Sequence, residues 1–146
     1  MPLEILKKLF DAQPPSGVYW LKSHVAVDEL SKLSKAHHMA FFHLEGKKIE
    51  KKEQFLNHAA VAMHFPDHFG NNWDAFEDCI TDLEWIDAEG YVIYFDHTEA
   101  FAEHHESQLE TVTELFQDAV TYWKGEGKPM LVLLSGSQPA EGIKRI

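Results

Sequence analysis

Lysine and arginine are absent from a long central stretch of this 146-residue chain. Between Asp67 and Trp123 the sequence holds 15 of its 24 acids and none of its 13 bases. Opposite charges would stabilise helices in this stretch at little cost, so their absence indicates a surface that binds a cationic partner. The alternative is an acidic face that only keeps the protein soluble.

The sequence also lacks the features of a protein that binds polyanions or membranes. A net charge of −11 disfavours direct binding to nucleic acid or to an anionic lipid surface. No run approaches the roughly 20 apolar residues of a membrane span. Glu4, Lys7 and Lys8 interrupt the apolar residues at the N-terminus, unlike the core of a signal peptide. We therefore expect a cytoplasmic protein whose partner is a basic protein, with no nucleic acid and no membrane.

Cysteine is nearly absent too. Cys79 is the only one, which excludes an internal disulfide framework, and its place among the apolar positions of a predicted helix indicates a buried thiol. The chain has neither a Walker loop nor a G-x-S-x-G elbow. The loop Ser135-Gly136-Ser137 lacks the lysine that usually follows in a phosphate-binding loop. We expect no enzyme and no cofactor.

The ten histidines suggest a metal site, above all His64 and His68 with Asp67 between them. Pro66 separates the two histidines, however, so they do not have the spacing of two ligands on one helical turn. The cluster Glu103-His104-His105-Glu106 lacks the His-Glu-x-x-His order of a zinc-binding helix. We therefore expect no metal site.

Apolar periodicity predicts alternating helices and strands. Helices are expected over residues 2–11, from residue 28, and over 50–64, 98–105 and 107–125, and strands over 17–21, 39–44, 91–95 and 130–134. Nearly continuous apolar strands are typical of parallel sheets covered on both faces. The sequence thus predicts an α/β fold with a small parallel sheet of three or four strands packed with helices, followed by an irregular tail from residue 135.

Residues 65–83 are the most informative part of the chain. Pro66 disfavours a helical conformation at Phe65, Gly70 can adopt the positive φ of a tight loop, and Asn71 or Asn72 can cap a helix. On a helical wheel the apolar positions gather on one side and the acids on the other. The apolar side comprises Trp73, Phe76, Cys79, Ile80 and Leu83, and the acidic side comprises Asp74, Glu77, Asp78 and Asp82.

In order, these residues read Pro66, His68-Phe69, Gly70, Asn71-Asn72, Trp73, Asp74-Ala75, Phe76, Glu77, Asp78-Cys79, Ile80. This run resembles the signature of the barstar family of intracellular ribonuclease inhibitors, and the resemblance extends over about residues 39–135. It implies a three-stranded parallel sheet covered by helices. It also implies that this helix and the loop before it block the active site of a ribonuclease, where Asp74 and Asp78 pair with its cations.

Some positions differ from the barstar pattern. His68 stands where barstar has a tyrosine, and Glu77 and Leu83 stand where it has interface tryptophans. Thr81 matches, and Asp118 replaces a supporting glutamate. The resemblance therefore implies the barstar binding mode with a changed aromatic rim.

These observations predict a barstar-like inhibitor of a basic ribonuclease whose acidic helix mimics RNA phosphates. The predicted partner-binding residues are His68, Phe69, Gly70, Asn72, Asp74, Glu77, Asp78, Thr81 and Asp118. The alternative is a barstar-fold interaction or immunity module for a different basic protein, such as a toxin that is not a ribonuclease. A hydrolase using Asp74 and Asp78 would need a cleft that keeps one acid protonated, and nothing in the pattern indicates such a cleft.

Residues 1–38 are predicted to form an N-terminal helix and a βα extension, and residues 39–146 the barstar-like domain, together as one compact unit. The extension could add an edge strand to the sheet or serve in oligomerisation.

Overall fold

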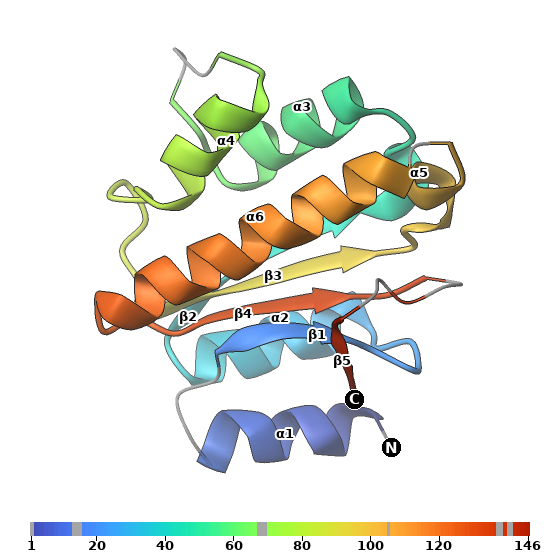
Figure 1. Ribbon diagram of the computed structural model, residues 1–146. Coiled ribbons are helices and arrows are strands. Elements are labelled where there is room, and N and C mark those ends of the chain that lie inside the picture. The colour runs from blue at the N-terminus through green and yellow to red at the C-terminus, as the bar shows by residue number, and fades with distance from the viewer. Residues whose placement is uncertain (1, 13–15, 67–69, 105, 137–138, 140–141) are drawn as a thin grey trace.

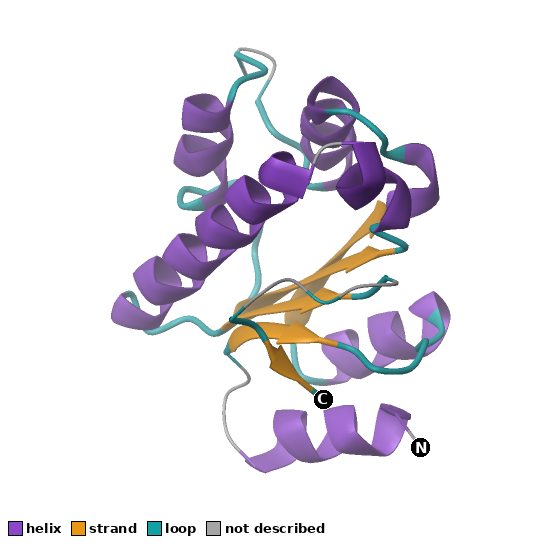
Figure 2. Ribbon diagram, turned by 45° about the vertical axis from the view of Figure 1, so that its right-hand side comes forward, coloured by secondary structure: helices purple, strands orange, loops and turns teal. Residues whose placement is uncertain are grey.

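A parallel sheet lies between two layers of helices (Figures 1 and 2). The computed structural model describes residues 2–12, 16–66, 70–104, 106–136, 139 and 142–146. One layer contains α1 (Pro2–Ala12) and α2 (Val27–Ala36). The other contains α3 (Lys52–Ala62), α4 (Trp73–Ile80), α5 (Glu99–His104) and α6 (Glu106–Gly125).

The described residues form a sheet of five parallel strands in the order β2-β3-β4-β1-β5. The strands are β1 (Gly17–Trp20), β2 (Met39–Glu45), β3 (Gly90–Asp96), β4 (Met130–Leu134) and β5 (Lys144–Arg145), and a short 3₁₀ helix, η1 (Gly46–Lys48), follows β2. The predicted α/β fold of barstar type, with its parallel sheet, is confirmed, but the sheet has five strands rather than three or four.

The short strand β5 lies in the tail that we expected to be irregular. Its backbone pairs with β1, because Ile146 N donates a 2.8 Å hydrogen bond to Trp20 O and Lys22 N donates a 3.0 Å hydrogen bond to Ile146 O. The exposed side chains of Lys144 and Arg145 give no apolar pattern, so only the pairing with β1 identifies the strand.

Alternate residues of the strands face the two helical layers, as the pleat requires. On β3, Ile93 and Phe95 join the core beneath α3, α4, α5 and α6, whereas Val92 and Tyr94 join the core above α1 and α2. Every residue of β3 is buried. Its continuous apolar run therefore reflects coverage on both faces.

The strands β1 and β2 are parallel, as their connection through α2 predicted, but they are not neighbours. β2 lies at one edge of the sheet, and β1 lies between β4 and β5. The N-terminal extension thus contributes an inner strand to the sheet. The division of the chain at residue 38 stays a prediction.

Most helix ends differ from the predicted ones by one or two residues, and α3 covers Lys52–Ala62 rather than residues 50–64. α4 stops at Ile80 rather than running to Leu83, which has a φ of 47°. α6 begins at Glu106, one residue before the predicted start. None of the described helices is long and apolar enough to span a lipid bilayer.

Candidate protein-binding site

The start of α4 is fixed by a side-chain cap. Asn72 Oδ1 accepts a 2.8 Å hydrogen bond from Ala75 N, which satisfies one of the N–H groups left free at a helix start. Asn71, with a φ of 50°, adopts the left-handed conformation that we expected at Gly70. Asparagine tolerates this conformation better than most residues. The cap places Asp74 in the first turn, where the helix dipole favours a negative charge.

The acids of α4 lie on its solvent side, as predicted. Asp74, Glu77 and Asp78 are exposed, and so is Asp82 just beyond the helix. No ion pair recorded among the described residues involves any of them. Like charges four residues apart, such as Asp74 and Asp78, destabilise a helix by about 0.2–0.5 kcal/mol per pair. The helix therefore carries charges that its own fold does not compensate.

The opposite side of α4 is anchored in the core. Phe76 and Ile80 are fully buried, and the Phe76 ring lies 5.4 Å from the Phe55 ring of α3 and 6.1 Å from the Phe116 ring of α6, between centroids. Leu83 is fully buried as well. Leu83 therefore does not take the place of the interface tryptophan with which the resemblance aligned it, because no part of it reaches the surface.

Two contacts set the register between α4 and α6. Phe76 contacts Phe116, and one turn further along α4 the carbonyl of Ile80 accepts a 2.8 Å hydrogen bond from Nε1 of Trp123, two turns further along α6. The chain advances in the same direction in both contacts, so the helices run side by side and parallel (Figure 1). Asp118, exposed on α6, follows Phe116 by two residues, as Asp78 follows Phe76.

The polar groups at the end of α4 are largely engaged within the helix. The Thr81 hydroxyl donates a 2.8 Å hydrogen bond to Glu77 O, and Thr81 N donates a 3.1 Å hydrogen bond to the same carbonyl. Thr81 is half-buried, and its hydroxyl oxygen keeps lone pairs that can accept a hydrogen bond. It can therefore contact a partner mainly as an acceptor.

A lysine of α3 lies beside the start of the acidic helix. Lys52 Nζ is 5.2 Å from the ring centroid of Trp73, the first residue of α4, and the Trp73 ring is 5.8 Å from that of Phe55. Trp73 is half-buried. No sequence pattern indicated this cation–π contact, because Lys52 lies outside the acidic stretch and a full helix before it.

The described part of the predicted site is therefore gathered on α4, at its two ends and on the adjacent α6. His68 and Phe69 lie outside the described residues. The remaining predicted residues are Gly70, Asn72, Asp74, Glu77, Asp78 and Thr81 on or next to α4, and Asp118 on α6.

A comparison with protein families gives this surface its context. The family model described as Barstar (barnase inhibitor) matches residues 39–135, from the first residue of β2 to the residue after β4. This chain belongs to the barstar family. A comparison with curated proteins gave no match. The barstar family consists of inhibitors rather than enzymes, which fits a protein that binds a protein partner. The elements α1, β1, α2 and β5 lie outside the matched part.

The thiol in this barstar-family helix is half-buried rather than fully buried. Burial is the main reason that the pKa of Cys79 is raised, and the nearby carboxylates of Asp82 and Asp78 raise it further. A raised pKa keeps the thiol protonated and weakly nucleophilic near neutral pH.

A buried carboxylate lies at the carboxyl ends of β2 and β3 of the barstar-family sheet. Asp96 Oδ2 is 3.0 Å from His43 Nε2, and Asp96 Oδ1 accepts a 3.2 Å hydrogen bond from Gly46 N. Burial opposes ionisation of Asp96, but the hydrogen bonds from His43 and Gly46 outweigh it and lower the pKa. A Cβ atom on Gly46 would overlap the Asp96 carbonyl, so only glycine fits here.

A second histidine supports the same turn. His58 Nε2, on α3, accepts a 3.2 Å hydrogen bond from Glu45 N, which requires a neutral ring. Burial is the main cause that lowers the pKa of His58. Both contacts hold the end of β2 against its neighbours, and we assign them to stability rather than to binding. In the described part of the chain no group of three or more His, Cys, Asp or Glu residues is placed to hold a metal ion.

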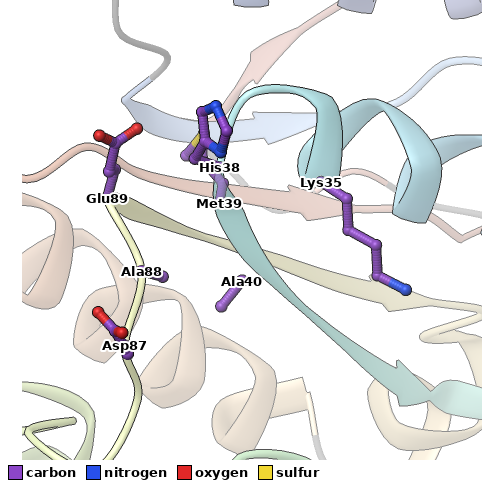
Figure 3. Close-up of a pocket in the computed structure, with 7 residues that line it drawn as sticks. All are labelled: Lys35, His38, Met39, Ala40, Asp87, Ala88 and Glu89. Carbon is purple, nitrogen blue, oxygen red and sulfur yellow. The ribbon is translucent and has the colours of Figure 1, made fainter.

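An open pocket of about 460 Å³ lies away from α4, at the amino ends of β2 and β3 (Figure 3). It is lined by Lys35, His38, Met39, Ala40, Asp87, Ala88 and Glu89. In Figure 3 Lys35 lies on one side of it and the two acids on the other. The pocket contains no residue of α4 or α6, so it is separate from the acidic surface.

Proposed function

We propose that this protein inhibits a basic ribonuclease by covering the active site of the nuclease with α4 and the loop before it. The observation that carries the proposal is a row of exposed carboxylates, with no ion pair recorded to the described residues, on a helix whose other side is fixed in the core. A ribonuclease that binds RNA has a cleft lined with cations. The carboxylates of Asp74 and Asp78 would occupy the positions of RNA phosphates in that cleft, and the enzyme would be blocked without any reaction.

Asp78 is expected to contribute most to the affinity. It is exposed in the last turn of α4, the turn that is joined to α6 by the bond from Trp123 to Ile80. Removing one member of a desolvated charge pair leaves the other buried and unpaired, which costs much more than an exposed pair contributes. The residues Asn72, Asp74, Glu77 and Thr81 would surround this centre.

The segregated charge supports fast association. A one-signed surface attracts an oppositely charged partner over about a Debye length, ~8–10 Å at physiological salt, and raises the association rate. Barnase and barstar are themselves a well-known example of such steering. Association should therefore slow as ionic strength rises.

The test is inhibition of a panel of small basic ribonucleases, barnase included, by wild type, Asp78→Ala and Asp28→Ala. Asp28 is an exposed aspartate of α2 on the other side of the sheet, so its replacement changes the net charge equally. We expect wild type and Asp28→Ala to inhibit at least one nuclease and Asp78→Ala to lose at least ~30-fold in affinity, about 2 kcal/mol. Circular dichroism of each variant is the control for folding. Failure of wild type to inhibit any nuclease would contradict the proposal.

The exposed acid Glu77 supports a second candidate, because it replaces an aromatic of the resemblance with a charge. This candidate is an interaction or immunity module for a basic protein that is not a ribonuclease. The two are distinguished by RNA competition. RNA displaces the inhibitor from a nuclease active site, whereas it does not displace a module bound elsewhere.

A further inference from the structure

An exposed aromatic ring lies beside the end of the acidic helix. The side chain of Tyr122, on α6, is 45% exposed, and its ring packs at 83° against the ring of Trp123 with centroids 5.2 Å apart. Nε1 of Trp123 in turn donates a hydrogen bond to Ile80 O. The tyrosine is therefore held by a residue that is fixed to the last turn of α4.

The helix geometry places Tyr122 on the same side of α6 as Asp118. Leu115, Asp118 and Tyr122 are spaced at i, i+3 and i+7, which brings them onto one side of a helix. Leu115 on this side is partly buried against the core beneath α3 to α6, whereas Gln117 on the other flank is exposed. The hydrogen bond from Trp123 to Ile80 brings the last turn of α4 next to this part of α6. Tyr122 thus borders the acidic surface near Thr81.

The ring is also available to a cation. Elsewhere in the protein, lysines already lie over aromatic rings: Lys52 over Trp73 and Lys128 over Tyr91 and Trp123. In the described part of the chain, no lysine or arginine lies over the ring of Tyr122. Lys124, the first base after the acidic stretch, is two residues further on and thus on the far side of α6.

We propose that Tyr122 belongs to the partner-binding surface and stacks against an arginine guanidinium of the partner, next to the carboxylate of Asp118. This inference rests on the proposed function, since it assumes that the acidic surface meets a cationic partner. A guanidinium can stack flat on an aromatic ring and donate in its plane to a carboxylate at the same time. An ammonium is a compact, strongly hydrated charge that gains less from the ring. The site therefore selects arginine over lysine.

The test compares binding of two probe peptides, hexa-arginine and hexa-lysine, to wild type, Tyr122→Ala, Tyr122→Phe and Ile5→Ala. Ile5 is 49% exposed on α1, on the other side of the sheet, and serves as the matched control. Calorimetry at low salt gives the dissociation constants, and NMR follows the ring protons of Tyr122. We expect Tyr122→Ala to weaken hexa-arginine binding about fivefold, with little change for hexa-lysine. Tyr122→Phe and Ile5→Ala should bind both peptides as wild type does.

Equal binding by wild type and Tyr122→Ala, an equal loss for both peptides, or no binding by wild type would each overturn the inference. The nuclease assay separates it from the proposed function. Inhibition that Asp78→Ala abolishes and Tyr122→Ala leaves intact overturns only the role of Tyr122. Arginine-specific binding through Tyr122 without inhibition of any nuclease overturns only the ribonuclease proposal.

Discussion

Nε1 of Trp123 donates a 2.8 Å hydrogen bond to the carbonyl of Ile80, the last residue of α4. The last four carbonyls of a helix have no partner within it, and this bond satisfies one of them in a buried environment. The same bond joins the end of the acidic helix to α6, the helix that carries Asp118.

Trp123→Phe should lower the free energy of unfolding by about 1–3 kcal/mol, because the Ile80 carbonyl loses its buried donor. It should also speed hydrogen exchange of the α4 amides, measured by NMR, since the helix end is no longer fixed. Trp85→Phe is the matched control, because Trp85 Nε1 donates a 2.9 Å bond to Met63 O rather than to α4. Equal acceleration of α4 exchange in both variants would show that the Ile80 bond has no special role.

Asp78→Asn should stabilise the isolated protein by a few tenths of a kcal/mol. It removes a like-charge neighbour of Asp74 one turn away, and no ion pair recorded in the described chain is lost. Thermal unfolding in low salt should show a higher Tm than wild type, and added salt should reduce the difference. If Asp78→Asn were less stable than wild type, the carboxylate would stabilise the fold through a structural partner, and its role would not be limited to binding.

Stability should fall as the pH decreases through the range below 6.5, the ordinary pKa of histidine. The folded state lowers the pKa of His58, chiefly through burial, so the unfolded chain binds a proton that the folded protein excludes. This contribution is fully present above the unfolded pKa and is lost as the pH falls towards the folded pKa. Urea unfolding from pH 8 to pH 5 should show the loss. His58→Gln should be less stable at pH 8 and should show a flatter profile, and an equally steep profile would contradict this role.

Asp82→Asn should speed alkylation of Cys79 at pH 8. The pKa of the thiol is raised by burial first and by Asp82 and Asp78 next, so neutralising Asp82 lowers the pKa and increases the thiolate fraction. The rate with iodoacetamide, a neutral reagent, measures the change. Glu114→Gln, on the exposed side of α6, is the charge-matched control and should react as wild type does. An unchanged rate for Asp82→Asn would contradict a contribution of Asp82 to the raised pKa of the thiol.

Much of the fold could be predicted because its signals are local. The period of apolar residues predicted α3, α4 and the buried strands β3 and β4, and the one-sided acids of α4 predicted its exposed face. The pattern also predicted a cap at Asn71 or Asn72, and the structure assigns it to Asn72. The positive φ lies at Asn71, the residue before the cap, rather than at Gly70.

Contacts between distant parts of the chain could not be predicted. Leu83 lies on the apolar side of the predicted helix, which fits either a buried or a partner-facing position. In the folded protein it is fully buried in the core. The pairing of Asp96 with His43 joins residues 53 positions apart, and no spacing in the sequence indicates it. The same holds for β5, whose two charged residues become a strand only because β1 offers a free edge.

The sequence by itself determined that this protein has a parallel α/β fold and a helix with one acidic and one apolar side, since periodicity and charge are properties of neighbouring residues. It also carried the pattern of the barstar family. Only the tertiary structure decided the strand order and the contacts that join α4 to α6, on which the proposed roles of Asp118 and Tyr122 rest. These depend on how buried surfaces from separate segments fit together, and that fit is fixed by packing in three dimensions rather than by any local pattern.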